Sequence, residues 1–149
     1  MGFSLTGAHV IFFVAAVIAA GAVSGVLIAI TTDVSTSLSY RSERIQEQLD
    51  TEFAIINDPK MIPLSAHSRY IFYLKNIGSK ILHTTNQSFQ IFINGEIVST
   101  ANFNFSDASI KPAEYTRLYI SNTVISSGDN TLQVVGPLSV RDEFIFTIP

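Results

Sequence analysis

The hydrophobic and polar positions divide the chain into three segments with different patterns. Residues 10–30 contain only Val, Ile, Phe, Ala, Gly, Leu and a single Ser. A helix of this length spans about 31 Å, which matches the hydrocarbon core of a bilayer. The first charged side chain is Asp33, and His9 is the only ionisable side chain before it. The pattern predicts a transmembrane helix in residues 1–32.

A cleaved signal peptide is the alternative for this first segment. Secretory signals have a basic leading region and a shorter apolar core of about 7–15 residues. Neither feature is present, because no Lys or Arg precedes Ala8 and the apolar run is longer. We therefore expect the helix to be retained as a permanent anchor.

Small residues form a stripe on the predicted membrane helix, at Gly21, Gly25 and Ala29. A GxxxG pair of this kind lets a second helix approach closely. Gly and Ala are also common in membrane helices that pack only against lipid, so this alternative stays open. The stripe predicts a helix-packing face.

Residues 33–52 are polar, hold no Pro or Gly, and carry apolar side chains at helical spacing. Such spacing predicts that the helix continues as a stalk. The apolar stripe is narrow and suits pairing with a second copy or with a partner helix, although a solvated connector remains the alternative. The residues assigned to stalk self-association are Val34, Leu38, Ile45 and Leu49.

Residues 53–149 change to short β-prone runs separated by turn residues. Asn94-Gly95 between two such runs predicts a two-residue type I′ hairpin, because both turn positions require positive φ. Seven or eight short strands without helical periodicity predict an immunoglobulin-like β-sandwich, and hence a mainly β fold. The predicted strands are residues 53–56, 70–74, 89–93, 96–98, 102–105, 115–120, 131–135 and 144–148.

The surface of this domain is sparsely charged. Phe92 points to the face opposite Ile91 and Ile93, so this strand either is buried on both faces or exposes an apolar side. A surface with so little charge is a candidate for protein contact. The charged residues between positions 61 and 110 are Arg69, Lys75, Lys80, Glu96 and Asp107.

Residue chemistry gives no sign of catalysis. The chain has no Cys, and its His residues, His9, His67 and His83, lie far apart, with the latter two expected on loops. Asp142 and Glu143 are neighbours at the entry to a predicted strand and should point to opposite faces, so they do not form an acid/base pair. We predict no catalytic, cofactor-binding or metal-ligating residue. A net charge of −3 with scattered basic residues argues against nucleic-acid binding.

Charge and sequons disagree on which side of the membrane the domain lies. Arg41 and Arg44 follow the span, and the positive-inside rule would place the domain in the cytoplasm. Two N-glycosylation sequons, Asn86-Gln87-Ser88 and Asn104-Phe105-Ser106, favour the outside. Either sequon is also expected by chance in a chain rich in Asn, Ser and Thr.

Three sequence blocks stand out: the apolar block 11–19, the block 50–59 that ends in Ile-Ile-Asn-Asp-Pro, and Phe-Tyr-Leu-Lys-Asn-Ile-Gly at 72–78. Together they resemble the FlaF/FlaG family of archaellum accessory proteins. The last two are closer to the FlaG type, while the opening Met-Gly-Phe-Ser is closer to FlaF.

The resemblance implies a non-enzymatic, stator-like archaellum component. It implies a single membrane pass with the sandwich outside, in the pseudoperiplasm between membrane and S-layer, which overrides the charge count. Expected partners are a second copy, a FlaF-type sibling, the S-layer and archaellum motor components. The alternatives are a membrane-anchored adhesin-like module and a minor pilin-like subunit. Archaellins carry a basic residue and Gly at a processing site before the apolar helix. No Lys or Arg precedes Ala8 here, so we expect an unprocessed anchor.

Overall fold

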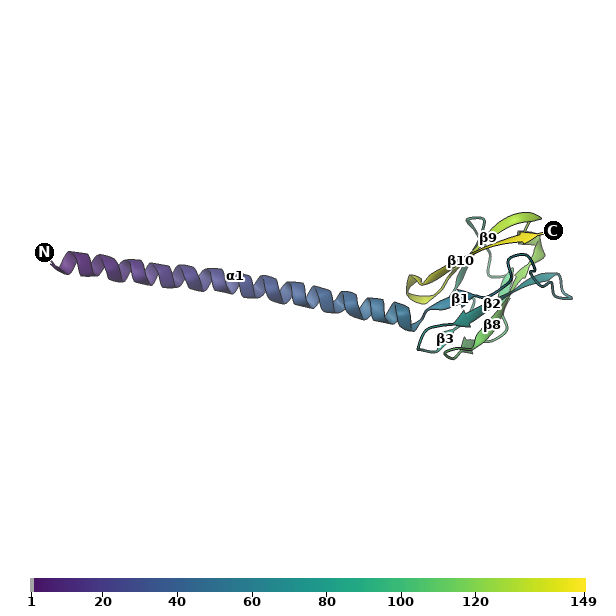
Figure 1. Ribbon diagram of the computed structural model, residues 1–149, viewed down its shortest axis with the longest axis horizontal. Helices are drawn as coiled ribbons and strands as arrows, with labels where there is room; N and C mark the ends of the chain where they lie inside the picture. Colours follow the sequence, from purple (N-terminus) through teal and green to yellow (C-terminus); the bar gives the residue numbers. More distant parts are fainter. Residues whose placement is uncertain (1) are drawn as a thin grey trace. The chain divides into compact units, whose positions relative to one another are not determined.

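A single helix, α1 (Gly2–Asp50), begins the computed structural model, which describes residues 2–149 and side chains from Leu5 onward. Met1, the first residue of the predicted membrane segment, lies outside the described residues. The chain forms two units, Met1–Arg44 and Ile45–Pro149, so the last turns of α1 belong to the second unit. Figure 1 shows α1 as an uninterrupted ribbon. The predicted continuation of the helix past Asp33 is confirmed.

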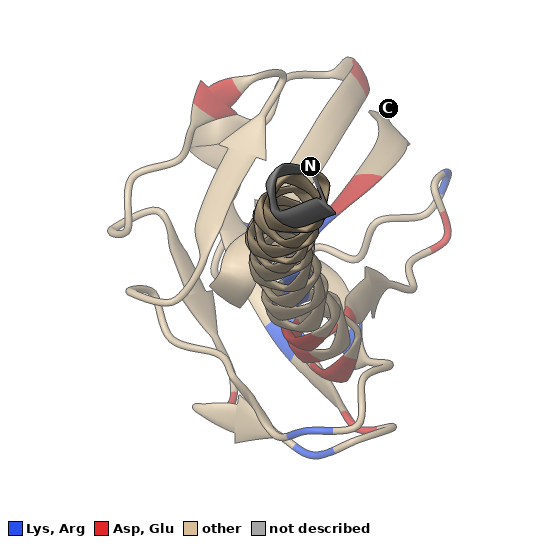
Figure 2. Ribbon diagram, turned by 90° about the vertical axis from the view of Figure 1, so that its left-hand side faces the viewer, with Lys and Arg blue, Asp and Glu red and all other residues tan. Residues whose placement is uncertain are grey.

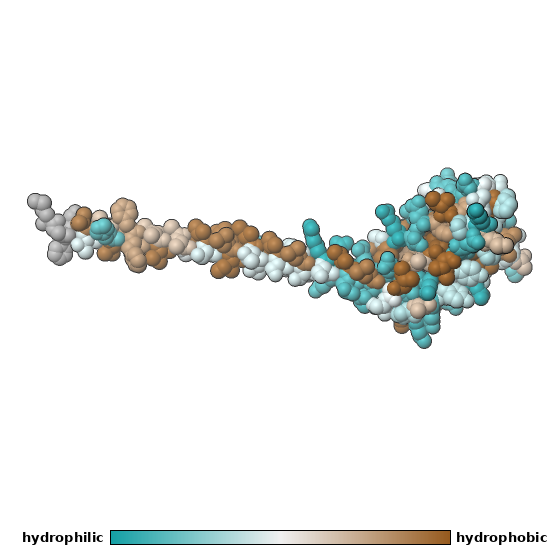
Figure 3. All heavy atoms as spheres, in the orientation of Figure 1, coloured by the Kyte–Doolittle hydropathy of each residue, from teal (hydrophilic) through white to brown (hydrophobic). Residues whose placement is uncertain are grey.

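The apolar part of α1 satisfies its polar groups within the helix. Ser24, Thr31 and Thr32 each donate a hydroxyl hydrogen bond to the carbonyl four residues earlier, at 2.8–2.9 Å. No charge interrupts the helix before Asp33, and Figures 2 and 3 show this stretch uncharged and largely apolar. Its large apolar side chains are exposed, with Phe12 at 74%. Among the described residues, α1 is the one helix long and apolar enough to cross a membrane.

The second unit continues as an antiparallel β-sandwich. The strands within the described residues are β1 (Phe53–Ile55), β2 (Arg69–Asn76), β3 (Leu82–His83), β4 (Gln90–Ile93), β5 (Glu96–Ile97), β6 (Phe103–Phe105), β7 (Ser109–Ile110), β8 (Tyr115–Ser121), β9 (Gly128–Val135) and β10 (Arg141–Ile148). The larger sheets have the strand orders β1-β2-β8-β6 and β10-β9-β4-β5, and β3 pairs with β7. Short 3₁₀ turns, η1 (Asn122–Val124) and η2 (Pro137–Ser139), connect strands.

The hydrophobic core lies between the two four-stranded sheets. Alternate residues of β2, β8, β9 and β10 point inward, as the two-residue period of a strand requires. The ring of Phe72 on one sheet packs edge-on against that of Phe146 on the other, with centroids 5.1 Å apart. Each such buried side chain contributes about 1.5–3 kcal/mol. The side chains that are at most 1% exposed include Phe72, Leu74, Ile91, Leu118, Ile120, Leu132, Val134 and Phe146.

The predicted hairpin is confirmed in detail. Ile93 pairs with Glu96, and the two residues between them, Asn94 and Gly95, have φ of 53° and 83°. Phe92 is half-buried while Ile91 and Ile93 are buried, so this strand has one core face and one partly exposed apolar face.

Two local predictions were wrong. His83 was expected on a loop, but it lies on β3 and pairs with Ser109 of β7. Residues 128–130 lie in the turn region between the predicted strands 115–120 and 131–135, but in the structure they begin β9, where Asn130 pairs with Phe146. In both places the pairing partner is distant in sequence, and that pairing overrides the local turn propensity.

Candidate functional site

The last turn of α1 is tied to the sandwich by a cluster that we call the junction clasp: Asp50, Glu52, Asn76, Gly78 and Lys80. The Asp50 carboxylate accepts a hydrogen bond from the Ser79 hydroxyl and forms an ion pair with the Lys80 ammonium at 3.2 Å. The backbone N–H of Lys80 donates to the Asp50 carbonyl at 2.9 Å. Both main chain and side chains therefore hold the helix end.

Gly78 and Asn76 complete the junction clasp from the turn after β2. The N–H groups of Ile77 and Gly78 donate to the Glu52 carbonyl at 3.0 and 2.9 Å. Asn76 is fully buried; its amide nitrogen donates to the carbonyls of Lys80 and Ile110, and its amide oxygen accepts from the Gly78 N–H. A Cβ at Gly78 would lie 2.3 Å from the Asp50 carbonyl oxygen, so only glycine fits.

Asp50 gives the junction clasp a dependence on pH. Hydrogen bonds from Ser79 and then Lys80 hold the pKa of the Asp50 carboxyl below its ordinary value of 3.8. Because the folded-state pKa is the lower one, the ionised carboxylate stabilises the fold above the unfolded pKa, and this contribution is lost as pH falls through the folded pKa.

We expect Asp50→Asn to lower the thermal unfolding midpoint of the sandwich by about 2–3 °C at neutral pH, since Asn keeps the shape but loses the charge. The difference in unfolding midpoint between Asp50→Asn and the native chain should shrink once pH falls below about 4. Circular dichroism melts of the full chain in uncharged detergent would measure both. Asp33→Asn, on the exposed part of α1, is the charge-matched control. A difference that stays constant down to strongly acidic pH would contradict this role for the carboxylate.

Beside the junction clasp lies a small cleft of about 230 Å³, lined mainly by Ile45, Leu49 and Val140. The Gln48 side chain donates to the Leu138 carbonyl at 3.0 Å and fastens η2 to the helix end. Leu138 and Ser139 have φ of 56° and 61°, which non-glycine residues adopt at a cost. Sequence reasoning missed η2, because nothing in Pro-Leu-Ser signals a left-handed backbone.

The residues assigned to helix association fall in both units. Gly21 and Gly25 have no neighbouring atom within 4 Å of an added Cβ, and Ala29 is exposed, so the small-residue face of α1 is open. Val34 and Leu38 are 54% and 61% exposed on α1 of the first unit. Ile45 and Leu49 line the cleft of the second unit and remain 58% and 54% exposed.

The two sequons differ in their surroundings. The Asn86 amide nitrogen donates to the carbonyls of Thr100 and Phe103 at 3.2 and 3.0 Å and so covers the free edge of β6. A glycan on that nitrogen would disturb this cap. Asn104 lies on the outer face of β6, where its amide oxygen accepts a hydrogen bond from the Arg69 guanidinium.

The remaining titratable residues have structural surroundings. Asp142 is half-buried and accepts a hydrogen bond from the Ile55 N–H at 2.7 Å, which joins β10 to β1. Glu143 is exposed, as expected for the next residue on a strand. His67 lies in a turn, as predicted. Within the described part of the chain, no group of three or more His, Cys, Asp or Glu is arranged to hold a metal ion.

A long apolar helix followed by a two-sheet antiparallel sandwich defines a class of protein with an apolar N-terminal helix and an immunoglobulin-like domain. The family model described as archaeal-type flagellin matches residues 2–144. A flagella-related protein G of Methanococcus voltae is 30% identical over 131 residues, which cover 85% of this chain and 86% of the relative. The chain belongs to the archaeal-type flagellin family and, within it, groups with the flagella-related G proteins.

Comparison with solved structures concerns the fold. The archaellum periplasmic stator protein FlaG from Sulfolobus acidocaldarius has a TM-score of 0.50 and 18% identity, over 64% of this chain and 99% of that one. A chain from the FlaF and FlaG complex of the same organism gives 0.49 and 19%, over 64% and 89%. The expected mainly β, immunoglobulin-like fold and the FlaF/FlaG resemblance are confirmed. The chain is a non-enzymatic component of the archaellum.

Proposed function

We propose that the chain is a static, stator-like archaellum protein, anchored in the cell membrane by one pass of α1, with its sandwich outside, between membrane and S-layer. The observation that carries the proposal is the uncharged stretch 10–30, whose side chains, such as Phe12 at 74% exposure, have no protein cover. Such a surface is stable in hydrocarbon and not in water. Relatives named for flagella favour this role over that of an adhesin-like module.

A stator-like role requires force to pass between the anchor and the domain. The junction clasp supports this requirement, because main-chain hydrogen bonds at Asp50 and Glu52 and the Asp50–Lys80 ion pair hold the helix end. A Gly/Ser-rich linker at this position would behave as a flexible coil and would let the domain turn freely.

Association with other helices would distribute the load. The open small-residue face at Gly21, Gly25 and Ala29 allows close approach of a second membrane helix. The exposed stalk stripe of Val34, Leu38, Ile45 and Leu49 suits pairing with a second copy. The family resemblance makes a FlaF-type sibling the first different partner to test, followed by the S-layer and motor components.

Replacing Val17 and Ile18 together by Arg tests the anchor. Each Arg at the centre of a span costs about 2.5–3.5 kcal/mol on insertion scales, so we expect loss of the protein from the membrane fraction and loss of swimming. Val17→Leu with Ile18→Leu is the matched control and should retain both. A chain that stays in the membrane and supports swimming with both Arg residues would contradict the proposal.

A single introduced cysteine can report the side of the membrane on which the sandwich lies. The chain lacks Cys, so Ser127→Cys in an exposed turn provides a single label site. A membrane-impermeant maleimide should label it in intact cells. Labelling only after permeabilisation would place the sandwich in the cytoplasm, as the positive-inside rule predicts.

A further inference from the structure

The outer face of the sheet β1-β2-β8-β6 carries tyrosines and cations side by side. Register places Tyr73 opposite Arg117 and Lys75 opposite Tyr115. The rings of Tyr73 and Tyr115 lie 5.8 Å apart, and Tyr115 is 52% exposed. We call this surface the tyrosine face, and its principal residues are Arg69, Tyr73, Lys75, Tyr115, Arg117 and Tyr119.

The tyrosine face is locally positive in a chain of net charge −3. Within the described residues the Asp50–Lys80 contact is the one ion pair within 4 Å, so none of Arg69, Lys75 and Arg117 has a carboxylate partner. Asp107, in a neighbouring turn, accepts from Ser106 and Thr116, and these hydrogen bonds, together with the nearby Arg117 charge, lower the pKa of its carboxyl. Glu114 accepts from the Lys111 N–H. Arg69 and Lys75 are therefore the cations available to an external acidic group.

At one end of the tyrosine face lies a groove of about 460 Å³, lined by Ser65, His67, Arg69, Ile71, Asn104 and Tyr119. Arg69 is half-buried there, and one arm of its guanidinium donates to the Asn104 side chain. No other acceptor for this guanidinium is found in the described part of the chain. An arginine held by one arm presents its remaining donors in a fixed fork, the geometry that binds a carboxylate with two hydrogen bonds.

We propose that the tyrosine face docks an acidic segment of another protein, with one carboxylate bound by Arg69 in the groove and the Tyr73 and Tyr115 rings packed against the segment. Tyr and Arg, together with Trp, are enriched among the few residues that contribute most of the binding energy in protein interfaces. Charge complementarity selects the acidic chemistry, because the face presents Arg69 and Lys75, neither of which has a carboxylate within 4 Å among the described residues, with Arg117 beside them. This proposal goes beyond the stator role and does not depend on it.

The test uses the full chain in an uncharged detergent and a fluorescein-labelled octaglutamate peptide, followed by fluorescence anisotropy. Arg69→Ala should weaken binding about tenfold through loss of a charge-assisted contact. Arg69→Lys should recover less than half of the lost binding free energy, because lysine keeps the charge but lacks the forked guanidinium donors. Tyr73→Ala should weaken binding about fivefold. Circular dichroism confirms that each variant is folded.

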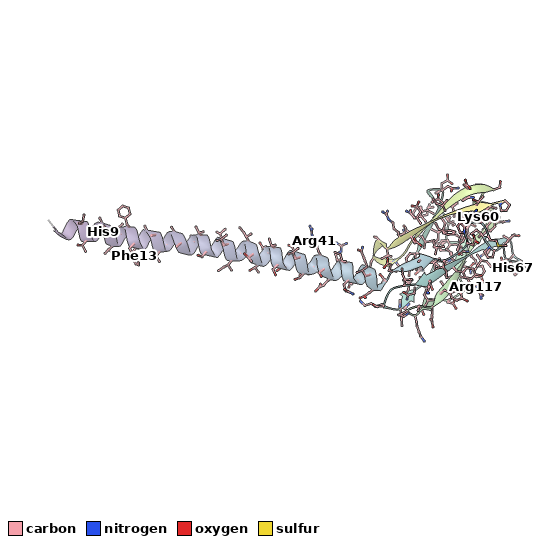
Figure 4. All side chains as sticks on the ribbon, in the orientation of Figure 1. His9, Phe13, Arg41, Lys60, His67 and Arg117 are labelled. Atoms are coloured by element: carbon pink, nitrogen blue, oxygen red, sulfur yellow. The ribbon has the colours of Figure 1, made fainter. Side chains whose placement is uncertain are left out.

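Lys60→Ala is the charge-matched control and should change the affinity by less than about twofold. Its loop lies beside β10, where the Thr147 N–H donates to the Pro59 carbonyl, and Figure 4 labels it together with His67 and Arg117. Equal losses for Lys60→Ala and Arg69→Ala, full rescue by Arg69→Lys, or absence of peptide binding would each overturn the proposal. So would tighter binding of polygalacturonate than of the peptide, which indicates an acidic polysaccharide. Self-association that Arg69→Ala abolishes would identify a second copy as the occupant instead.

Discussion

Replacing Gly78 by Ala is expected to lower the free energy of unfolding of the sandwich by about 3 kcal/mol and to release the last turn of α1. The added Cβ would lie 2.3 Å from the Asp50 carbonyl oxygen, 2.6 Å from its carbon and 2.9 Å from the Glu52 nitrogen. All three are backbone atoms. They cannot withdraw without stretching the hydrogen bonds that Lys80 and Ile77 donate to this segment.

Two measurements would check the Gly78→Ala prediction. Denaturant unfolding of the full chain in detergent gives the stability, and hydrogen exchange at the Ile77 and Lys80 amides reports whether the junction clasp opens. Gly7→Ala is the matched control, because nothing lies within 4 Å of a Cβ there and helical alanine is favourable. If both amides of Gly78→Ala exchanged at the same rates as in the native chain, the backbone would accommodate the methyl group and the prediction would be wrong.

Replacing Asn76 by Ala is expected to lower the free energy of unfolding of the sandwich by about 4 kcal/mol. The side chain is fully buried, and its removal takes a donor from the carbonyls of Lys80 and Ile110. The Gly78 N–H loses one of its two acceptors and keeps the Glu52 carbonyl. Each unsatisfied buried polar group costs about 1–3 kcal/mol, and a small cavity adds to this. Water that enters the cavity would replace some of the lost hydrogen bonds and reduce the destabilisation.

Equilibrium unfolding measures this effect, and Asn122→Ala is the matched control. Asn122 is exposed in η1, so its replacement should lower the free energy of unfolding by less than about 0.5 kcal/mol. Asn76→Ala combined with Gly78→Ala should be less destabilising than the sum of the single variants, because both disrupt the same turn. Strict additivity, or equal costs for the two asparagines, would argue that Asn76 does not organise the junction clasp.

The hairpin and the helix show which features are predictable from local sequence. Asn94-Gly95 admits positive φ at both positions, and this restriction fixes the turn and the register of β4 with β5 whatever surrounds them. The apolar run before Asp33 and the absence of Pro likewise predict α1, because helix hydrogen bonds form between residues four apart.

Other features depend on residues that are distant in sequence. β3 and β7 are two residues each and carry no periodicity, and they exist because Leu82 pairs with Ile110. The cations Lys75 and Arg117 stand 42 positions apart in the numbering, and register across β2 and β8 puts them on one face. No spacing rule relates such positions before the fold is known.

The sequence by itself determined the uncharged apolar helix, its continuation as a stalk, the hairpin and the sandwich class, because hydropathy and turn stereochemistry act over a few residues. It also indicated the family through the blocks at 50–59 and 72–78. Only the tertiary structure decided that Asp50 and Asn76 meet around Gly78, and that Arg69 reaches a groove beside Asn104. The hydrogen bonds of Asp50 with Ser79 and of Arg69 with Asn104 join residues that are distant in sequence. They form only once the chain has folded, so local sequence does not predict them.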